Sequence, residues 1–285
     1  MSIKASEVKN LREKTGLGMM ECKRALEEAK GDIDLAITNL RKNSALKAEK
    51  KSSRTAIEGV ILVQANNNSN NSIILEINCE TDFVAKDENF INFTNDVMQT
   101  CFESPEKTLE ELSTESLEEK RQSLVQKIGE NIVIRRKSNI SSGFVSSYIH
   151  ANNKIGVIVS LESENDELGK DIAMHIAASS PIVVNPEDVD DGLLSKEREI
   201  IAAQVAGSDK PEEIIQKMIA GRLDKFLSEV SLIKQPFVKD PSEKLKTLIE
   251  KSNNKVLSFT RFEVGEGIKV EKKDFAEEVK EQLSK

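Results

Sequence analysis

The chain has few side chains that could act as nucleophiles, general bases or metal ligands. His150 falls at the expected end of a strand and His175 among apolar helix positions, so a structural role is the simpler interpretation of both. No serine, cysteine or acid pair beside His150 completes a nucleophilic set, and no GxGxxG, GxxxxGKS/T, HExxH or GxSxG pattern occurs in the 285 residues. Bond chemistry would therefore rest on carboxylates such as Glu80 and Asp82. Neither has an evident partner across a cleft, which argues against a hydrolase, and we expect no cofactor and no metal site.

Composition predicts a helix-rich protein of the cytoplasm. Charged residues make up 32% and the net charge is −8, a balance typical of a well-solvated chain. No run approaches the roughly 18 apolar residues of a membrane-spanning helix, and the first residues carry no apolar export segment. One tyrosine and no tryptophan disfavour a base-stacking surface for nucleic acid. The odd number and wide spacing of the cysteines predict reduced, mostly buried thiols at Cys22, Cys79 and Cys101.

The N-terminal residues 1–54 differ in charge from the rest of the chain. They hold 13 Lys and Arg against 8 Asp and Glu, although the whole chain is acidic. Apolar residues at helical spacing predict a bundle of three helices, the first capped by Ser6 and ended by the TGLG turn, the third capped by Asp32. The basic segment 41–54 that follows has no apolar stripe, so we expect a solvated linker that is helical in part.

From residue 55 the pattern alternates between strands and helices and predicts an α+β fold. Two β-rich runs flank the polar stretch NNNSNNS at 66–72, which predicts a hairpin. The expected strands are 60–63, 73–77, 132–137, 144–150, 155–161 and 256–264, and the expected helices are about 87–103, 106–128 and 166–178.

Residues 187–229 predict an inserted helical hairpin. Helical spacing stops at Gly207 and restarts after Pro211, which with two following acids is a helix start signal. Its apolar face exceeds what two helices hide from one another, so we expect it to pack on something else. A short amphipathic helix is expected at 274–284.

The segment NCETDFVAK at 78–86 lies where a strand ends and a helix begins, and it allows two interpretations. Thr81 and Asp82 could cap the helix, with Phe83 and Val84 supplying a hydrophobic staple. Alternatively, the corner presents Phe83 to solvent as an interface anchor. Both interpretations stay open on the residues alone.

Several long motifs, in the same order along the chain, resemble the bacterial translation elongation factor Ts family. They are KNLREKTGLGMMECK at 9–23, NCETDFVA at 78–85, KIGENI at 127–132, HIAA at 175–178, QPFV at 235–238 and RFEVGEG at 261–267. The resemblance implies an N-terminal three-helix bundle similar to ubiquitin-associated (UBA-like) domains, two core subdomains with antiparallel sheets, an inserted hairpin that dimerises some members, and a C-terminal helix. The implied division is 1–54 for the UBA-like module and basic linker, 55–140 for subdomain N, 141–186 plus 230–265 for subdomain C, 187–229 for the hairpin and 266–285 for the C-terminal module.

The resemblance also implies a function. It implies a guanine-nucleotide exchange factor for elongation factor Tu, a GTPase, acting by binding and without covalent chemistry. In the family an Asp-Phe pair wedges into the GTPase near its magnesium site, which here implies Asp82 and Phe83, and Asp82 either competes for groups around the metal or only caps the corner. The other implied partner contacts are Thr81 and Val84 beside the wedge, Arg12, Met19 and Met20 on the GTPase domain, Ile128, Gly129 and His150 on the wedge side, and Val238 toward the partner's other domains.

Other classes of function remain open from the residues alone. Met19 and Met20 suit either a core or an exposed contact surface. The three-helix module could be an adaptor that binds a partner, with the rest of the chain as scaffold. In that case Phe83→Ala would have no effect on the binding or release of any nucleotide. The basic segment 41–54 could bind RNA, although the net charge of −8 argues for weak contact.

Overall fold

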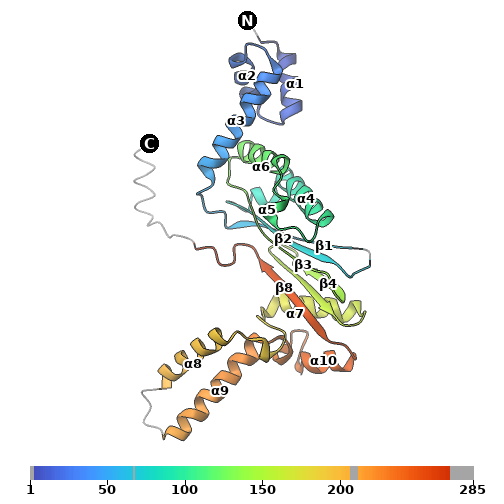
Figure 1. The fold of residues 1–285 in the computed structure, drawn as a ribbon, viewed down its shortest axis with the longest axis vertical. Helices are drawn as coiled ribbons and strands as arrows, with labels where there is room; N and C mark the ends of the chain where they lie inside the picture. The colour runs from blue at the N-terminus through green and yellow to red at the C-terminus, as the bar shows by residue number, and fades with distance from the viewer. Residues whose placement is uncertain (1–2, 67, 206–210, 270–285) are drawn as a thin grey trace. The chain divides into compact units, whose positions relative to one another are not determined.

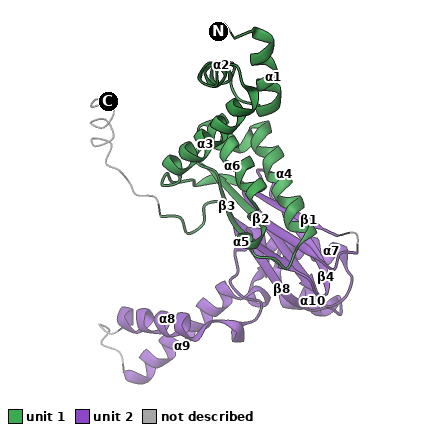
Figure 2. Cartoon of the chain, turned by 45° about the horizontal axis from the view of Figure 1, so that its top comes forward, with its two compact units in different colours: residues 1–60, 76–136, 264–285 green, residues 61–75, 137–263 purple. Residues whose placement is uncertain are grey.

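The fold is α+β, as the sequence predicts, in a computed structural model that describes residues 3–66, 68–205 and 211–269 (Figure 1). The chain forms two compact units. Unit 1 comprises residues 1–60, 76–136 and 264–285, and unit 2 comprises 61–75 and 137–263 (Figure 2). The five-part division implied by the resemblance stays a prediction. Among the described residues, no helix combines the length and the apolar character needed to cross a membrane.

Unit 1 begins with the predicted three-helix bundle. Its helices are α1 (Ala5–Thr15), α2 (Met19–Glu28) and α3 (Ile33–Lys51). They enclose a small core in which Leu11, Cys22 and Leu26 are fully buried. A core of this size gives a bundle little stability by itself.

The ends of these helices follow local rules, with one difference from the sequence prediction. Asp32 caps α3 as predicted, because its carboxylate accepts the Leu35 N–H at 3.0 Å. Ser6 does not cap α1. The cap residue is Lys4, whose N–H donates to the Glu7 carboxylate at 2.9 Å, so the start of the helix is stabilised by an acid in its first turn.

The basic segment 41–54 is helical to Lys51, which confirms the predicted helical part, but it packs on another helix and so is not a free linker. Helix α3 runs to Lys51 and packs along α6 (Glu115–Ile128). Ser44 and Ala48 are buried in this contact, and the Ser44 hydroxyl donates to the Gln126 side-chain oxygen. Small residues on one face allow close helix packing without forming the apolar stripe that the sequence interpretation required.

The rest of unit 1 contains three helices and parts of three strands. Strands β1 (Glu58–Ala65), β2 (Ser72–Cys79) and β3 (Val133–Ile140) form a sheet in that order, and their residues 61–65, 72–75 and 137–140 are assigned to unit 2. Every residue of β2 is buried, which explains its unbroken apolar run. A short 3-10 turn, η1 (Val84–Lys86), leads to α4 (Glu88–Glu103). The prediction of a single helix at 106–128 is wrong. The segment forms two helices, α5 (Leu109–Leu112) and α6, because Thr108 and Thr114 each cap a new helix.

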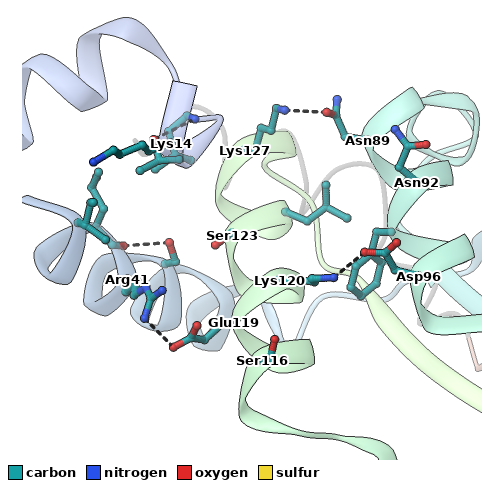
Figure 3. Close-up of a pocket in the computed structure, with 17 residues that line it drawn as sticks. Lys14, Arg41, Asn89, Asn92, Asp96, Ser116, Glu119, Lys120, Ser123 and Lys127 are labelled. Atoms are coloured by element: carbon teal, nitrogen blue, oxygen red, sulfur yellow. Dashed lines mark hydrogen bonds and ion pairs between the residues drawn. The ribbon is translucent and has the colours of Figure 1, made fainter. Parts of the chain in front are cut away.

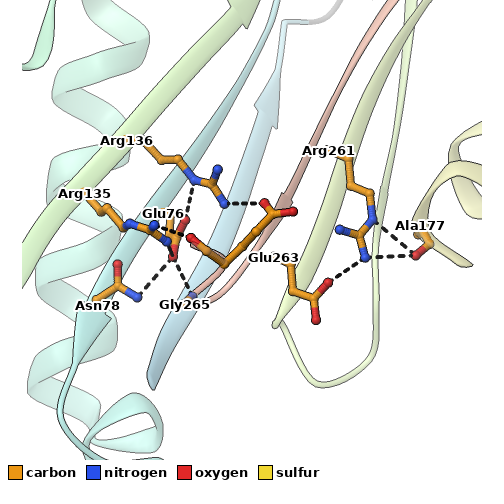
Figure 4. A network of polar contacts seen from close by, with 9 residues as sticks. Glu76, Asn78, Arg135, Arg136, Ala177, Arg261, Glu263 and Gly265 are labelled. Carbon is orange, nitrogen blue, oxygen red and sulfur yellow. Dashed lines mark hydrogen bonds and ion pairs between the residues drawn. The ribbon is translucent and has the colours of Figure 1, made fainter. Parts of the chain in front are cut away.

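A buried carboxylate joins β2 and β3 to the segment that follows the last strand (Figure 4). Glu76 has no exposed side-chain surface and accepts hydrogen bonds from Arg135 at 2.8 Å, Arg136 at 2.5 Å and the Gly265 N–H at 2.9 Å. Burial alone would raise the pKa of Glu76, but these donors together with Asn78 lower it below its usual value.

Unit 2 contains a second sheet covered by a helix. Strands β4 (Phe144–Ile149), β5 (Ile155–Leu161) and β8 (Val256–Glu263) pair antiparallel in the order β4-β5-β8. Helix α7 (Asp166–Ser179) packs on β4 and β5. It approaches closely at Gly169, where an added Cβ would lie 2.1 Å from the Ser146 hydroxyl oxygen.

The predicted inserted hairpin is present in unit 2. It consists of α8 (Asp191–Val205) and α9 (Glu212–Val230), preceded by the turn η2 (Pro186–Asp188) and followed by η3 (Leu232–Lys234). No residue of α9 is buried. The structure adds three short elements that the sequence analysis did not predict: β6 (Pro236–Phe237), β7 (Asp240–Lys244) and α10 (Leu245–Lys251). The helix expected at 274–284 lies outside the described residues.

Candidate partner-binding site

The corner between β2 and α4 presents an aromatic ring to solvent. Phe83 is 82% exposed, whereas the next two residues, Val84 and Ala85, are buried beneath the corner. A ring this exposed cannot form the hydrophobic staple, so the interface-anchor interpretation of Phe83 fits the structure. The thiol of Cys79 donates to the Thr81 carbonyl at 3.1 Å at the base of the corner. All three cysteines are buried thiols outside any disulfide bond, as predicted.

The backbone of the corner is held by a single carboxylate from the loop after α6. Glu130 accepts the N–H of Glu80 and the N–H of Thr81 on one oxygen, each at 3.0 Å. Its other oxygen accepts the Thr81 hydroxyl at 2.7 Å. Hydrogen bonds to a charged acceptor are stronger than neutral ones. We call these three bonds the Glu130 clamp.

A second set of bonds runs from the corner back to the loop after α6 and to the end of α3. Glu80 accepts the Asn131 N–H at 2.6 Å and lies 3.6 Å from the Arg54 guanidinium. The buried Asn131 amide donates to the carbonyls of Ser52 and Arg54, at 3.3 Å and 2.9 Å. The Glu80 carboxylate, considered above for acid–base chemistry, is therefore engaged in holding the loop.

Two predicted contact residues lie at the C-terminal end of α6, directly before Glu130 and Asn131. Ile128 is the last residue of α6, and Gly129 ends the helix in the left-handed conformation, with φ +91°. The Gly129 carbonyl accepts the Lys51 ammonium. Burial, together with the nearby positive charges of Arg54 and Lys47, lowers the pKa of Lys51. The fold thus brings residues 128–131 beside the corner.

Asp82 does not cap helix α4 and lies at the surface of the corner. Helix α4 is capped by Asp87, whose carboxylate accepts the N–H groups of Asn89 and Phe90. A hydrogen bond from the Asn89 side chain is the main reason that the pKa of Asp87 lies below its usual value. Asp82 instead pairs with Lys86 at 3.0 Å and stays half exposed. The cap of α4 therefore leaves the Asp82 carboxylate at the surface beside Phe83.

The N-terminal bundle carries a second group of predicted contacts. Arg12 is exposed on α1, and Met19 and Met20 begin α2 with exposed fractions of 53% and 70%. Exposure of both methionines excludes the core-filler interpretation. Next to them, Glu21 accepts the Lys47 ammonium at 2.7 Å and the Gln126 amide at 3.3 Å. Burial would raise the pKa of Glu21, but these donors lower it, and the carboxylate ties α2 to α3 and α6.

The remaining predicted contacts belong to unit 2. His150 follows β4 in an exposed turn, with its Nδ1 atom 2.9 Å from the Asn152 side-chain oxygen. Val238 is 42% exposed, and its N–H donates to Nδ1 of His175 at 3.2 Å. His175 is fully buried, as predicted, with Nε2 2.8 Å from the Gln235 side-chain oxygen. It orders the segment that displays Val238.

A pocket of about 600 Å³ lies among α3, α4 and α6 in unit 1 (Figure 3). Two ion pairs lie among its lining residues: Arg41 lies 3.3 Å from Glu119, and Lys120 lies 2.7 Å from Asp96. The residues predicted as partner contacts do not line this pocket. In the described part of the chain, no group of three or more His, Cys, Asp and Glu is placed to hold a metal ion.

Sequence reasoning missed the residues that hold the corner. The motif KIGENI at 127–132 contributes to the family resemblance, but the resemblance implies no role for Glu130 or Asn131. The available signal was an acid and an amide directly after a helix-ending glycine, a pattern suited to binding backbone groups. Their partners at the corner lie 49 to 51 positions earlier in the chain, and the carbonyls that Asn131 binds lie 77 and 79 positions earlier, so local pattern could not identify them.

These features define an α+β protein of two units with an immobilised aromatic corner. A family model described as Elongation factor TS matches residues 80–266. The chain is 52% identical over 282 residues to elongation factor Ts of Hahella chejuensis, covering 99% of each chain. Identity is 52% over 278 residues with elongation factor Ts of Marinobacter nauticus, covering 98% of this chain and 96% of the relative, and 51% over 287 residues with that of Teredinibacter turnerae, covering 100% and 98%.

The chain belongs to the elongation factor Ts family. It is accordingly a translation elongation factor, with a role in protein biosynthesis.

Proposed function

We propose that this chain is a guanine-nucleotide exchange factor for elongation factor Tu. It binds the GDP complex of this GTPase in the cytoplasm, promotes GDP release by wedging the GTPase domain open near its magnesium site, and stabilises the nucleotide-free form until GTP binds. The observation that carries the proposal is Phe83, 82% exposed on a corner whose backbone is held from within the chain.

Such a protein needs no bond chemistry, because exchange is a difference between two affinities. A factor that binds the nucleotide-free GTPase better than the GDP-bound form lowers the affinity of the GTPase for GDP. GDP in turn lowers the affinity for the factor by the same ratio. A thousandfold effect corresponds to about 4 kcal/mol of coupling. A ring that fits only the opened GTPase supplies such a difference, since its contacts exist in one state alone.

The position of Asp82 supports an electrostatic part in the same step. The carboxylate lies beside Phe83 and pairs with Lys86, both at the surface. If the ring displaces the groups that position the partner's Mg²⁺, phosphate charge is left poorly neutralised and GDP binds more weakly. Asp82 would then compete for the polar groups around that metal.

The other exposed side chains extend the proposed contact. Arg12, Met19 and Met20 would bind the GTPase domain, because flexible methionines adapt to a partner surface. Thr81, Ile128, Gly129 and His150 would belong to the wedge side, and Val238 would face the partner's other domains. Val84 is buried, so it would support the corner from beneath rather than contact the partner.

The experiment that tests the proposal follows release of fluorescent GDP from purified elongation factor Tu by stopped flow. The intact chain should accelerate release by orders of magnitude, and Phe83→Ala should lose most of that effect. Ile182→Ala is the matched control, because Ile182 is also a large exposed apolar residue but lies outside the proposed contact. No acceleration with a matched partner would refute the proposal. Acceleration retained by Phe83→Ala would mean that other residues cause GDP release, and Arg12, Met19 and Met20 would be tested first.

A homodimer through residues 187–229 is a separate proposal. The support is the exposed apolar surface of the hairpin, which includes Ile200 on α8 and Ile214 on α9. Sedimentation of the wild-type chain and of Ile214→Asp tests it. A dimer that the substitution dissociates would support the proposal, and a monomeric wild type at high concentration would exclude it.

A further inference from the structure

We infer that Glu130 is a positioning residue for Phe83, fixing the corner in its projecting conformation before any partner arrives. The inference rests on the proposed exchange function, because it concerns how Phe83 performs that function. Glu130 is not itself among the proposed partner contacts, and it acts through residues 80 and 81, which it binds.

The first argument is the convergence of donors on one side chain. An exposed phenyl ring makes no hydrogen bonds, so its direction is set by the backbone that carries it. Just before Phe83, two successive N–H groups and one hydroxyl all point to the Glu130 carboxylate, at 3.0, 3.0 and 2.7 Å. Three bonds to one planar group fix both the position and the rotation of a short backbone segment.

The second argument is that the clamp is reciprocal. Glu80, whose N–H is held by Glu130, uses its own carboxylate to hold the Asn131 N–H at 2.6 Å. The two segments therefore bind each other through both a backbone donor and a side-chain acceptor. Neither can shift without breaking bonds to a charged group.

The third argument is the attachment of the clamp to α3. The Asn131 amide binds two carbonyls just beyond the end of α3, and Lys51 at its last turn binds the Gly129 carbonyl. Helix α3 belongs to the bundle that displays Met19 and Met20. The clamp thus joins both proposed contact surfaces of unit 1 through one helix.

The test is a double-mutant cycle in the GDP-release assay, with the full-length chain and elongation factor Tu. Glu130→Ala should lower the stimulated release rate about tenfold or more, since small misplacements of a working group reduce rates strongly. Glu130→Gln should lower it less, because its oxygen can keep both N–H groups while its amide donates to the Thr81 hydroxyl. Glu119→Ala, an acid on α6 paired with Arg41, is the matched control and should stay within about twofold of wild type.

The cycle separates positioning from general structure. If Glu130 acts through Phe83, Glu130→Ala should have almost no further effect in the Phe83→Ala background. Equal effects in both backgrounds would overturn the inference. Failure of the wild-type chain to stimulate release would instead remove the proposed function and this inference with it.

Hydrogen exchange of the free chain gives a readout that needs no partner. The amides of Glu80 and Thr81 should exchange at least about tenfold faster in Glu130→Ala, while amides in the core of β2 keep their protection. Unchanged exchange at residues 80 and 81 would show that the clamp does not hold the corner and would overturn the inference. Loss of protection throughout the chain would also count against it, as Glu130 would then be a residue of global stability.

Discussion

Gly265 donates its backbone N–H to the carboxylate of Glu76 at 2.9 Å, across 189 positions of the sequence. Position 265 requires glycine for two reasons. Its φ is +77°, and an added Cβ would lie 2.5 Å from the Ile57 carbonyl oxygen. The first glycine of the RFEVGEG motif is therefore explained by close backbone contact at a buried ionic network.

Replacing Glu76 should destabilise unit 1. Glu76→Gln leaves Arg135 and Arg136 without their carboxylate, and breaking a buried ion pair costs about 3–5 kcal/mol, less here because both arginines reach solvent. We expect a loss of about 2–3 kcal/mol in the free energy of unfolding, measured by urea denaturation at neutral pH. Glu266→Gln, which removes only the exposed partner of Arg136, should change it by under about 1 kcal/mol. Equal losses in both variants would contradict the assigned role of Glu76.

The same network predicts a pH dependence. Because the pKa of Glu76 is lowered in the folded chain, unfolding takes up a proton at acidic pH. The stabilisation is complete above the ordinary pKa of 4.5 and is lost as pH falls through the folded pKa. The difference in unfolding free energy between wild type and Glu76→Gln should therefore be constant above pH 4.5 and shrink below it. A difference that grows on acidification would reverse the assigned direction.

His175 predicts a second pH effect, in unit 2. Burial lowers its pKa, although the bond to Gln235 partly opposes this. The Val238 N–H donates to Nδ1, so the proton of the neutral ring resides on Nε2 and faces the Gln235 side-chain oxygen. Stability should be constant above the ordinary pKa of 6.5 and fall with pH between that value and the folded pKa, because the unfolded chain binds the proton first. Nitrogen-detected NMR of the ring checks the tautomer, and finding the proton on Nδ1 would exclude this arrangement.

Two phenylalanines on either side of η1 should respond oppositely to truncation. Phe83→Ala should change the free energy of unfolding by under about 0.5 kcal/mol, because the ring is 82% exposed. Phe90→Ala should lower it by about 3–5 kcal/mol, because that ring is fully buried. Chemical denaturation of both variants measures this contrast. A large loss for Phe83→Ala would mean that the ring packs on the chain rather than projecting.

Helix α3 should protect the basic segment from trypsin. Lys42, Lys47, Lys50 and Lys51 would all be cleavage sites in a solvated linker, but they lie in a helix that packs on α6. Ala48→Glu places a charge at a position with 2% exposure and should separate the two helices. Limited proteolysis should then cut this segment much faster in the variant than in wild type. Rapid cleavage of the wild-type chain would restore the linker interpretation.

The sequence was sufficient where structure depends on local pattern. The hairpin, the Asp32 cap, the inserted helices and the buried His175 all follow from spacing and capping rules. Two of the wrong or missing predictions depend on residues that are distant in the sequence. Ala48 is buried only because α6 lies against it, and Glu130 shows its role only beside residues 80 and 81. The short β6 and β7 lack enough residues to carry a periodic signal.

The Glu130 clamp also determines when the corner loses its conformational freedom. A segment held by three hydrogen bonds in the isolated chain has been ordered during folding, so association leaves chiefly the side-chain torsions of Phe83 to be fixed. Docking then requires no preceding loop search, and an association rate would be limited by encounter and orientation. Heating that melts the 128–131 loop would slow association before the helices themselves unfold, because the bonds from Glu130 to residues 80 and 81 would then be lost.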